Sequence, residues 1–236
     1  MKKTLIPAVV ICLIGMTACN NTTPESITLN NQNDTLSWAM GTSMGNAIKA
    51  SGIAFNEEAV LAAVRNAMEG NELKLDQESY EKALASINLQ MAQNHQQQDE
   101  KLRSEVEAKE KAYFEKLLKE NPNVKQTEHG FYYEVLKAGK GPNAKYAQRI
   151  KFDYKGFFMF TGKMIDQTYG NRPPIVTTVT KHMFPGLVQA LQMMNAGSIY
   201  RFYFPQHTAF GKFGDKNIPP YTPIVYEVEV HELYND

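Results

Sequence analysis

The chain contains 236 residues, in which 25 Lys and Arg side chains balance 25 Asp and Glu side chains. A net charge of zero argues against a protein that overall charge recruits to nucleic acid or to an acidic membrane. The length is enough for one medium domain and a smaller one. The aromatic residues concentrate after Phe131, whereas the first half is rich in Ala, Gln, Asn, Glu and Met. This change in composition predicts two modules of different class.

The N-terminus has the pattern of a secretion signal. Lys2 and Lys3 precede an apolar run at residues 5–14 that is too short to span a membrane as a mature helix. The sequence Met-Thr-Ala-Cys at 16–19 then resembles the lipobox of bacterial lipoproteins. The resemblance implies a signal peptide at 1–18, cleavage before Cys19 and attachment of lipid to Cys19. The alternative is an ordinary secretory signal that is cleaved nearby.

The mature chain is therefore expected to contain a single cysteine. Cys12 would be removed with the signal and Cys19 would be acylated, so no disulfide, cysteine metal site or cysteine nucleophile is predicted. Residues 19–33 are polar and include Pro24, which predicts a flexible tether.

Three helices are predicted in the first half. Asp34 is expected to cap a helix that runs to about residue 50, and Asn56 is expected to cap a second helix that ends at Gly70. From about residue 77 to residue 119 there is neither Pro nor Gly, which predicts one long helix. Its middle, residues 93–101, has no apolar side chain to bury, so this part is expected to be exposed and to connect two domains.

The first two helices and half of the third make only a thin core, although the first has an apolar stripe of Leu36, Met40 and Met44. Oligomerisation is a usual remedy for a core of this size. We therefore predict an all-α homodimerisation domain at 34–92, an exposed linking helix at 93–120 and a second domain at 121–236. The methionines could instead form an adaptable binding surface, but filling of the core is the simpler interpretation.

The second half has the pattern of a sheet with one short helix. Pro185 suits the first position of a helix whose apolar residues recur at helical spacing, and 195–197 supplies its stop. The strands are predicted from alternation and from β-branched and aromatic content. An antiparallel sheet wrapped on one short helix is an α+β domain. The predicted strands are 131–136, 150–155 with a continuation to 160, 165–166, 199–204 and 224–233.

Seven short motifs occur in order along this half. They are Tyr154-x-Gly156, Ile165-Asp166, Met183-Phe184-Pro185-Gly186, Ala196-Gly197, Ala209-Phe210-Gly211, Ile218-Pro219-Pro220 and Tyr226-x-Val228-x-Val230. Their order and approximate spacing resemble the FKBP-type peptidyl-prolyl isomerase pattern across residues 125–234. The helical half resembles the N-terminal dimerisation domain of the Mip/FkpA-like branch of that family.

The resemblance implies an enzyme that isomerises X–Pro bonds in client proteins that fold in the bacterial envelope. The twisted transition state has lost amide resonance and is less polar than the planar ground state, so a dry aromatic site favours it without a nucleophile, metal or cofactor. The family pattern implies that Asp166 is a polar wall residue and that the backbone N–H of Phe184 binds the substrate carbonyl. The implied catalytic residues are Tyr154, Asp166, Phe184 and Phe210, and the implied substrate-binding residues are Ile165, Met183, Leu187, Ile218 and Tyr226.

Several positions depart from the family pattern. Leu187 stands where the family usually has a Trp at the pocket floor, and Phe210 stands for a Tyr whose hydroxyl binds substrate. Ile165 and Tyr226 each stand for Phe. These departures favour an alternative function, a dimeric chaperone with a degenerate pocket and little or no catalysis. A third interpretation is a purely structural envelope adaptor.

The expected partners are proline-containing polypeptides, a second copy of the chain through its N-terminal helices, and a lipid bilayer through Cys19. The expected location is the bacterial cell envelope, as a lipoprotein of the outer membrane that faces the periplasm. No nucleic acid, metal or cofactor is predicted. The histidines show no metal-ligand spacing and are assigned no role; they are His95, His129, His182, His207 and His231.

Overall fold

The computed structural model describes residues 27–234, apart from residues 73, 171 and 181. The predicted signal peptide, Cys19 and much of the predicted tether therefore lie outside the described residues. Contacts between residues divide the chain into two compact units, Met1–Gly70 and Asn71–Asp236. Among the helices described, none combines the length and the apolar character needed to cross a membrane.

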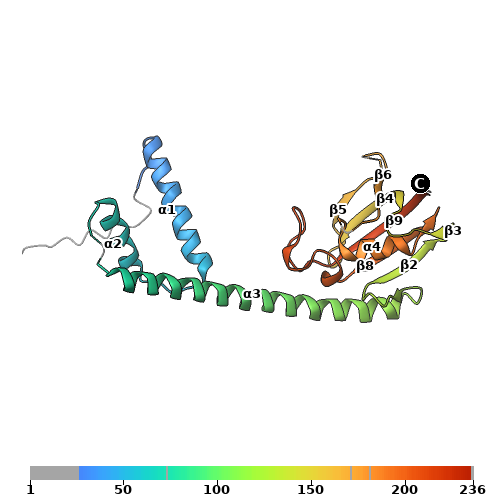
Figure 1. Cartoon of the computed structure of the whole chain (residues 1–236), viewed down its shortest axis with the longest axis horizontal. Helices are drawn as coiled ribbons and strands as arrows, with labels where there is room; N and C mark the ends of the chain where they lie inside the picture. The colour runs from blue at the N-terminus through green and yellow to red at the C-terminus, as the bar shows by residue number, and fades with distance from the viewer. Residues whose placement is uncertain (1–26, 73, 171, 181, 235–236) are drawn as a thin grey trace, which may run out of the picture. The chain divides into compact units, whose positions relative to one another are not determined.

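The first unit contains two helices, α1 (Gln32–Ser51) and α2 (Glu57–Met68), shown in Figure 1. The prediction that Asp34 caps α1 was wrong. Asn31 is the N-cap, and its side chain accepts a hydrogen bond from the backbone N–H of Asp34, which lies in the first turn. The prediction for α2 is confirmed, because the side chain of Asn56 accepts a hydrogen bond from the backbone N–H of Ala59.

Within residues 27–70, neither helix buries an apolar side chain. The buried residue of α1 is Ser51, and α2 has none. Large apolar side chains of both helices are exposed to solvent, from Met44 at 38% to Met68 at 84%. The first unit by itself therefore lacks the hydrophobic core on which a globular fold normally depends.

The second unit contains a seven-stranded sheet in the order β1-β2-β8-β9-β4-β5, in which β6 also pairs with β4 (Figure 1). Strands β3 and β7 form a separate pair. Every pairing is antiparallel, which confirms the predicted α+β class. The strands are β1 (Lys125–Gln126), β2 (Tyr132–Lys137), β3 (Lys140–Asn143), β4 (Arg149–Phe158), β5 (Met164–Gln167), β6 (Ile175–Thr178), β7 (Asn195–Ala196), β8 (Ile199–Phe204) and β9 (Ile224–Leu233).

The helix α4 (Pro185–Gln192) begins at the predicted proline. It ends three residues before the predicted stop, because Asn195 and Ala196 form β7 and pair with β3. Strands β2, β4, β5, β8 and β9 are the predicted ones, with small shifts at their ends. The short strands β1, β3, β6 and β7 were not predicted.

The main core lies between α4 and one face of the sheet. Side chains alternate between the two faces of a strand, so Phe202 and Phe204 of β8 point to this core while Tyr203 points to the other face. The apolar side chains that α4 contributes to the core are Leu187, Val188, Ala190 and Leu191.

The helix α3 (Gln77–Glu120) is continuous through the polar segment 93–101, as predicted. Only Glu110 and Phe114 of this helix are buried. The ring of Phe114 stacks on Tyr132 with 4.0 Å between centroids and joins a second small core with Tyr203 and others. The C-terminal turns of α3 therefore pack on the face of the sheet opposite to α4.

Candidate functional site

Four aromatic side chains meet beside the N-terminal end of α4. Tyr154 of β4 and Tyr226 of β9 stack with 5.2 Å between ring centroids. The ring of Phe184, the residue before α4, packs edge-on against that of Tyr226 with 5.5 Å between centroids. Its centroid lies 4.9 Å from that of Phe210. We refer to Tyr154, Phe184, Phe210 and Tyr226 as the aromatic cluster. It brings together residues that are up to 72 positions apart in the chain, from Tyr154 to Tyr226 (226 − 154).

The pairing of β4 with β9 explains the Tyr-x-Gly motif of the cluster. Gly156 lies directly opposite Tyr226 in the antiparallel register. A Cβ atom at Gly156 would lie only 2.7 Å from Cε1 of Tyr226, which is closer than real Cβ contacts. Glycine therefore leaves the space that the Tyr226 ring needs, as is usual where a strand glycine allows a close approach.

The remaining apolar residues predicted for the site belong to the same core. Leu187, in the first turn of α4, and Ile218 are buried, with 8% and 5% of their surfaces exposed. Ile165 and Met183 are half-buried and pack against this core. The structure therefore gathers all the predicted apolar residues around one core.

Asp166 of β5 supplies a carboxylate at the edge of the cluster. It accepts a hydrogen bond of 2.6 Å from the Tyr154 hydroxyl and another of 2.6 Å from Nη2 of Arg172. The hydrogen bond from Tyr154 is the largest cause that lowers the pKa of Asp166, and Arg172 lowers it further. Burial and the neighbouring carboxylate raise the pKa of Tyr154. The pair therefore has a fixed arrangement, in which the tyrosine keeps its proton and the carboxylate is ionised.

Arg172 was not predicted as a site residue. It lies in the connection between β5 and β6, outside every motif of the sequence pattern. The only available signal was a basic residue six positions after Asp166, and this spacing has no meaning without the folded loop.

Two hydrogen-bond donors of the site have no partner within the described residues. One is the backbone N–H of Phe184, since this residue precedes the helix and its N–H joins neither strand nor helix pairing. The other is the hydroxyl of Tyr226. Burial raises the pKa of Tyr226, and Tyr154, Asp166 and Asp215 raise it further, so this hydroxyl keeps its proton. Both groups can donate to an acceptor on a bound molecule.

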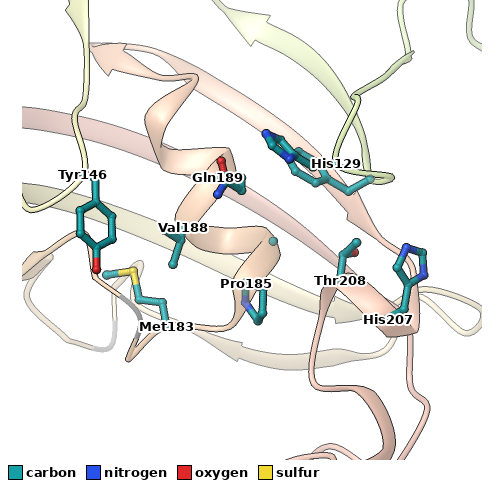
Figure 2. Close-up of a pocket in the computed structure, with 10 residues that line it drawn as sticks. His129, Tyr146, Met183, Pro185, Val188, Gln189, His207 and Thr208 are labelled. Atoms are coloured by element: carbon teal, nitrogen blue, oxygen red, sulfur yellow. The ribbon is translucent and has the colours of Figure 1, made fainter.

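A separate cavity of about 460 Å³ opens along α4. Figure 2 shows Tyr146 and Met183 on one side of it and His129, His207 and Thr208 on the other. Met183 is the one residue that this cavity shares with the predicted site, and the histidines were assigned no role from the sequence. The lining residues are His129, Phe131, Tyr146, Met183, Pro185, Gly186, Val188, Gln189, His207 and Thr208.

Comparisons with known proteins match both halves of the chain. Residues 33–135 match the family model described as the domain amino terminal to FKBP-type peptidyl-prolyl isomerase. Residues 141–231 match the model of FKBP-type peptidyl-prolyl cis-trans isomerase. Together the two models span the helical half and the sheet.

Individual relatives match over most of their length. The chain is 30% identical over 210 residues to the isomerase FkpA of Escherichia coli (strain K12), covering 86% of this chain and 76% of that protein. It is 26% identical over 211 residues to the outer membrane protein MIP of Legionella longbeachae, covering 89% of this chain and 88% of that protein. The crystal structure of FkpA from Escherichia coli has a TM-score of 0.62 and 27% identity, covering 87% of this chain and 98% of that one.

These matches agree with the order of the elements and with the motifs that form the aromatic cluster. The helical half and the sheet domain are both shared with the isomerase relatives rather than one of them alone. The chain therefore belongs to the FKBP-type peptidyl-prolyl cis-trans isomerase family.

Proposed function

We propose that the aromatic cluster binds the proline ring of an X–Pro segment and that this binding speeds cis–trans isomerisation in proteins that fold in the bacterial envelope. The observation that carries the proposal is the convergence of Tyr154, Phe184, Phe210 and Tyr226. Beside them lies the N–H of Phe184, which has no hydrogen-bond partner among the described residues. The aromatic surface suits an apolar ring such as that of proline, and the N–H suits the amide carbonyl next to it.

The chemistry needed is a difference in binding between two states of the substrate. Rotation about an X–Pro bond has a barrier of roughly 18–20 kcal/mol because the planar amide is stabilised by resonance. The twisted transition state loses that resonance and becomes less polar. An apolar surface therefore stabilises it relative to the planar amide, which prefers water. The N–H of Phe184 would hold the substrate carbonyl during rotation.

Tyr226 offers a hydroxyl where Phe210 cannot. Phe210 lacks the hydroxyl that the family pattern places at that position, whereas Tyr226 has one that the pattern lacks. The rings of both residues contact Phe184. We infer that the Tyr226 hydroxyl donates to the substrate in place of the missing group, and that Asp166, held by Tyr154 and Arg172, forms the polar wall.

The test is the rate of isomerisation of a short X–Pro peptide by the full chain. We expect catalysis above the uncatalysed rate, and a loss of at least about tenfold in kcat/KM for Phe184→Ala, since removing the ring takes away the centre of the cluster. Phe213→Ala is the matched control, because Phe213 is 83% exposed and lies outside the cluster. A folded parent protein with no rate above background would rule out the enzyme.

The second candidate function is a chaperone whose catalysis is weak. Leu187 favours it, because a leucine provides less flat surface under a proline ring than the tryptophan of the family pattern. The exposed apolar side chains of α1 and α2 favour it as well. If Leu187→Trp combined with Phe210→Tyr raises kcat/KM more than about tenfold, the natural site is impaired. Equal suppression of aggregation by the parent and Phe184→Ala, with a client that lacks proline, would then identify the chaperone.

We further propose that the N-terminal helices form a homodimer and that acylated Cys19 anchors the protein in the outer membrane facing the periplasm. The exposed apolar residues of the first unit support the dimer.

The sequence at 16–19 supports the anchor. The relative from Legionella longbeachae carries the name outer membrane protein MIP. Mass spectrometry of the membrane fraction tests the anchor, since Cys19→Ser should abolish acylation and release the protein.

A further inference from the structure

We propose that the cavity along α4 is a second binding site for the client polypeptide, and that it accepts an uncharged apolar or aromatic side chain a few residues away from the proline. The proposal rests on the proposed function, because it assumes that the proline itself occupies the aromatic cluster. It adds a source of specificity to which residues outside the motifs contribute, such as Tyr146, Gln189 and His207.

The floor of the cavity is apolar and well packed. Phe131 is fully buried and Val188 is 8% exposed, while Met183 and Pro185 form one wall (Figure 2). A cavity of about 460 Å³ falls within the range of roughly 300–1,000 Å³ that is typical of ligand sites. It is therefore large enough for a bulky side chain together with part of its backbone.

The rim carries hydrogen-bonding groups that have no partner within the described residues. These are the side-chain amide of Gln189, the hydroxyl of Tyr146 and the imidazole of His207. The lining as described contains no Asp, Glu, Lys or Arg. An apolar floor with neutral donors and acceptors at its edge suits an apolar side chain and its flanking peptide groups, and it offers neither a counter-ion nor a metal ligand set for a charged ligand.

The cavity and the aromatic cluster are built from consecutive residues. Met183 and Pro185 line the cavity, and Phe184 between them is the centre of the cluster. Since an extended chain advances roughly 3.3 Å per residue, a polypeptide with its proline on Phe184 needs only a few residues to reach the cavity. The same short segment, at the N-terminal end of α4, would therefore contact the client at both places.

The test compares two fluorescent peptides that share one X–Pro core, of which only the second is extended by three apolar residues on each side. Binding to the full chain is measured by anisotropy, and isomerisation of the core peptide is measured separately. Gln189→Trp fills the cavity with a large ring. Gln192→Trp is the matched control, because Gln192 is also a half-buried glutamine of α4, but it lies outside the cavity and its side chain donates to the carbonyl of Val188.

We expect the parent and Gln192→Trp to bind the extended peptide about tenfold more tightly than the core peptide. Burial of one apolar side chain favours binding, and the loss of conformational entropy in the bound peptide offsets part of this gain. Gln189→Trp should lose this advantage and bind the core peptide normally. Equal affinity of the parent for both peptides, or an advantage that survives in Gln189→Trp, would overturn the proposal. Isomerisation of the core peptide decides the proposed function independently, because that peptide does not reach the cavity.

Discussion

The two units of this chain differ in how far their apolar side chains are buried. In the second unit, α4 and the sheet enclose a core in which Leu191, Phe202 and Phe204 are fully buried. In the first unit, side chains of similar type, such as Leu36 and Met40, are 59% and 77% exposed. The difference indicates that the sheet domain has a core of its own, whereas the first two helices have none within the described part of their own unit.

The largest expected effect is on the stability of the sheet domain, which has the buried core that the described part of the first unit lacks. Leu191→Ala should lower the free energy of unfolding of the sheet domain by about 2–5 kcal/mol, since it removes a fully buried side chain and leaves a cavity. The measurement is chemical denaturation of the full chain followed by the aromatic signal of the sheet domain. Leu118→Ala is the control, because Leu118 is 42% exposed and should change little. Equal effects of the two substitutions would contradict the description of this core.

The second prediction tests whether another copy covers the first unit. Met40→Asp places a charge on the exposed stripe of α1 and should weaken the dimer by at least about tenfold, because a charge is costly to bury without a partner. The measurement is sedimentation over a range of chain concentrations. Asn46→Asp adds the same charge to the same helix off this stripe and should leave the association intact. A parent protein that sediments as a monomer at every concentration would refute the dimer.

The third prediction concerns the contact of α3 with the sheet domain. Glu110 is 6% exposed and accepts a hydrogen bond of 2.5 Å from the backbone N–H of Gln206. Burial raises its pKa to about 7, and the charge of Glu107 acts in the same direction. Because the pKa of Glu110 in the folded protein lies above its ordinary value, the folded state binds the proton more tightly than the unfolded state. The contribution of Glu110 to the stability of the folded protein is therefore greatest at low pH. It falls as the pH rises from about 4.5 to about 7.

Between pH 5 and pH 8 this loss should reach up to about 3 kcal/mol, from roughly 1.4 kcal/mol per pKa unit. Glu110→Gln keeps the acceptor for Gln206 without the charge and should flatten the dependence. Glu107→Gln, with its side chain 53% exposed, should largely retain it. Denaturation at several pH values measures the effect, and a parent whose stability does not change over this range would show that Glu110 is ionised at no cost.

The smallest expected effect lies within the aromatic cluster. Tyr226→Phe should lower kcat/KM by about two- to tenfold, because a neutral hydrogen bond contributes roughly 0.5–1.5 kcal/mol. Phe210→Tyr in the same variant should restore part of the loss, since it returns a hydroxyl to the place where the family pattern has one. Tyr113→Phe, on α3 outside the cluster, is the control. Unchanged kcat/KM in Tyr226→Phe would exclude this hydroxyl from substrate binding.

The features that were predictable from the sequence are those set by residues near one another in the chain. Pro185 begins α4 because a proline needs no N–H partner at that position. Asn56 caps α2 through its own side chain. The cap of α1 was assigned to Asp34 because Asn31 offered an equally good acceptor three residues earlier, and local chemistry alone does not separate the two.

The features that were missed depend on segments distant in the chain. The early end of α4 follows from the pairing of Asn195 and Ala196 with β3, more than 50 residues away. Arg172 joins the site only because its loop folds back to Asp166. The cavity along α4 combines His129 and His207 with the helix, and no spacing in the sequence brings these residues together.

The sequence by itself determined the two-module organisation, the α+β class and the family, because periodicity, turn residues and the order of the motifs are properties of the chain. It also identified the residues of the aromatic cluster through the resemblance that those motifs carry. Only the tertiary structure decided that the Phe184 N–H and the Tyr226 hydroxyl lack partners among the described residues, that Arg172 bonds to Asp166, and that a cavity along α4 shares Met183 with the predicted site. Each of these facts depends on which distant groups meet in space, and this is settled by packing across the sheet rather than by any local preference.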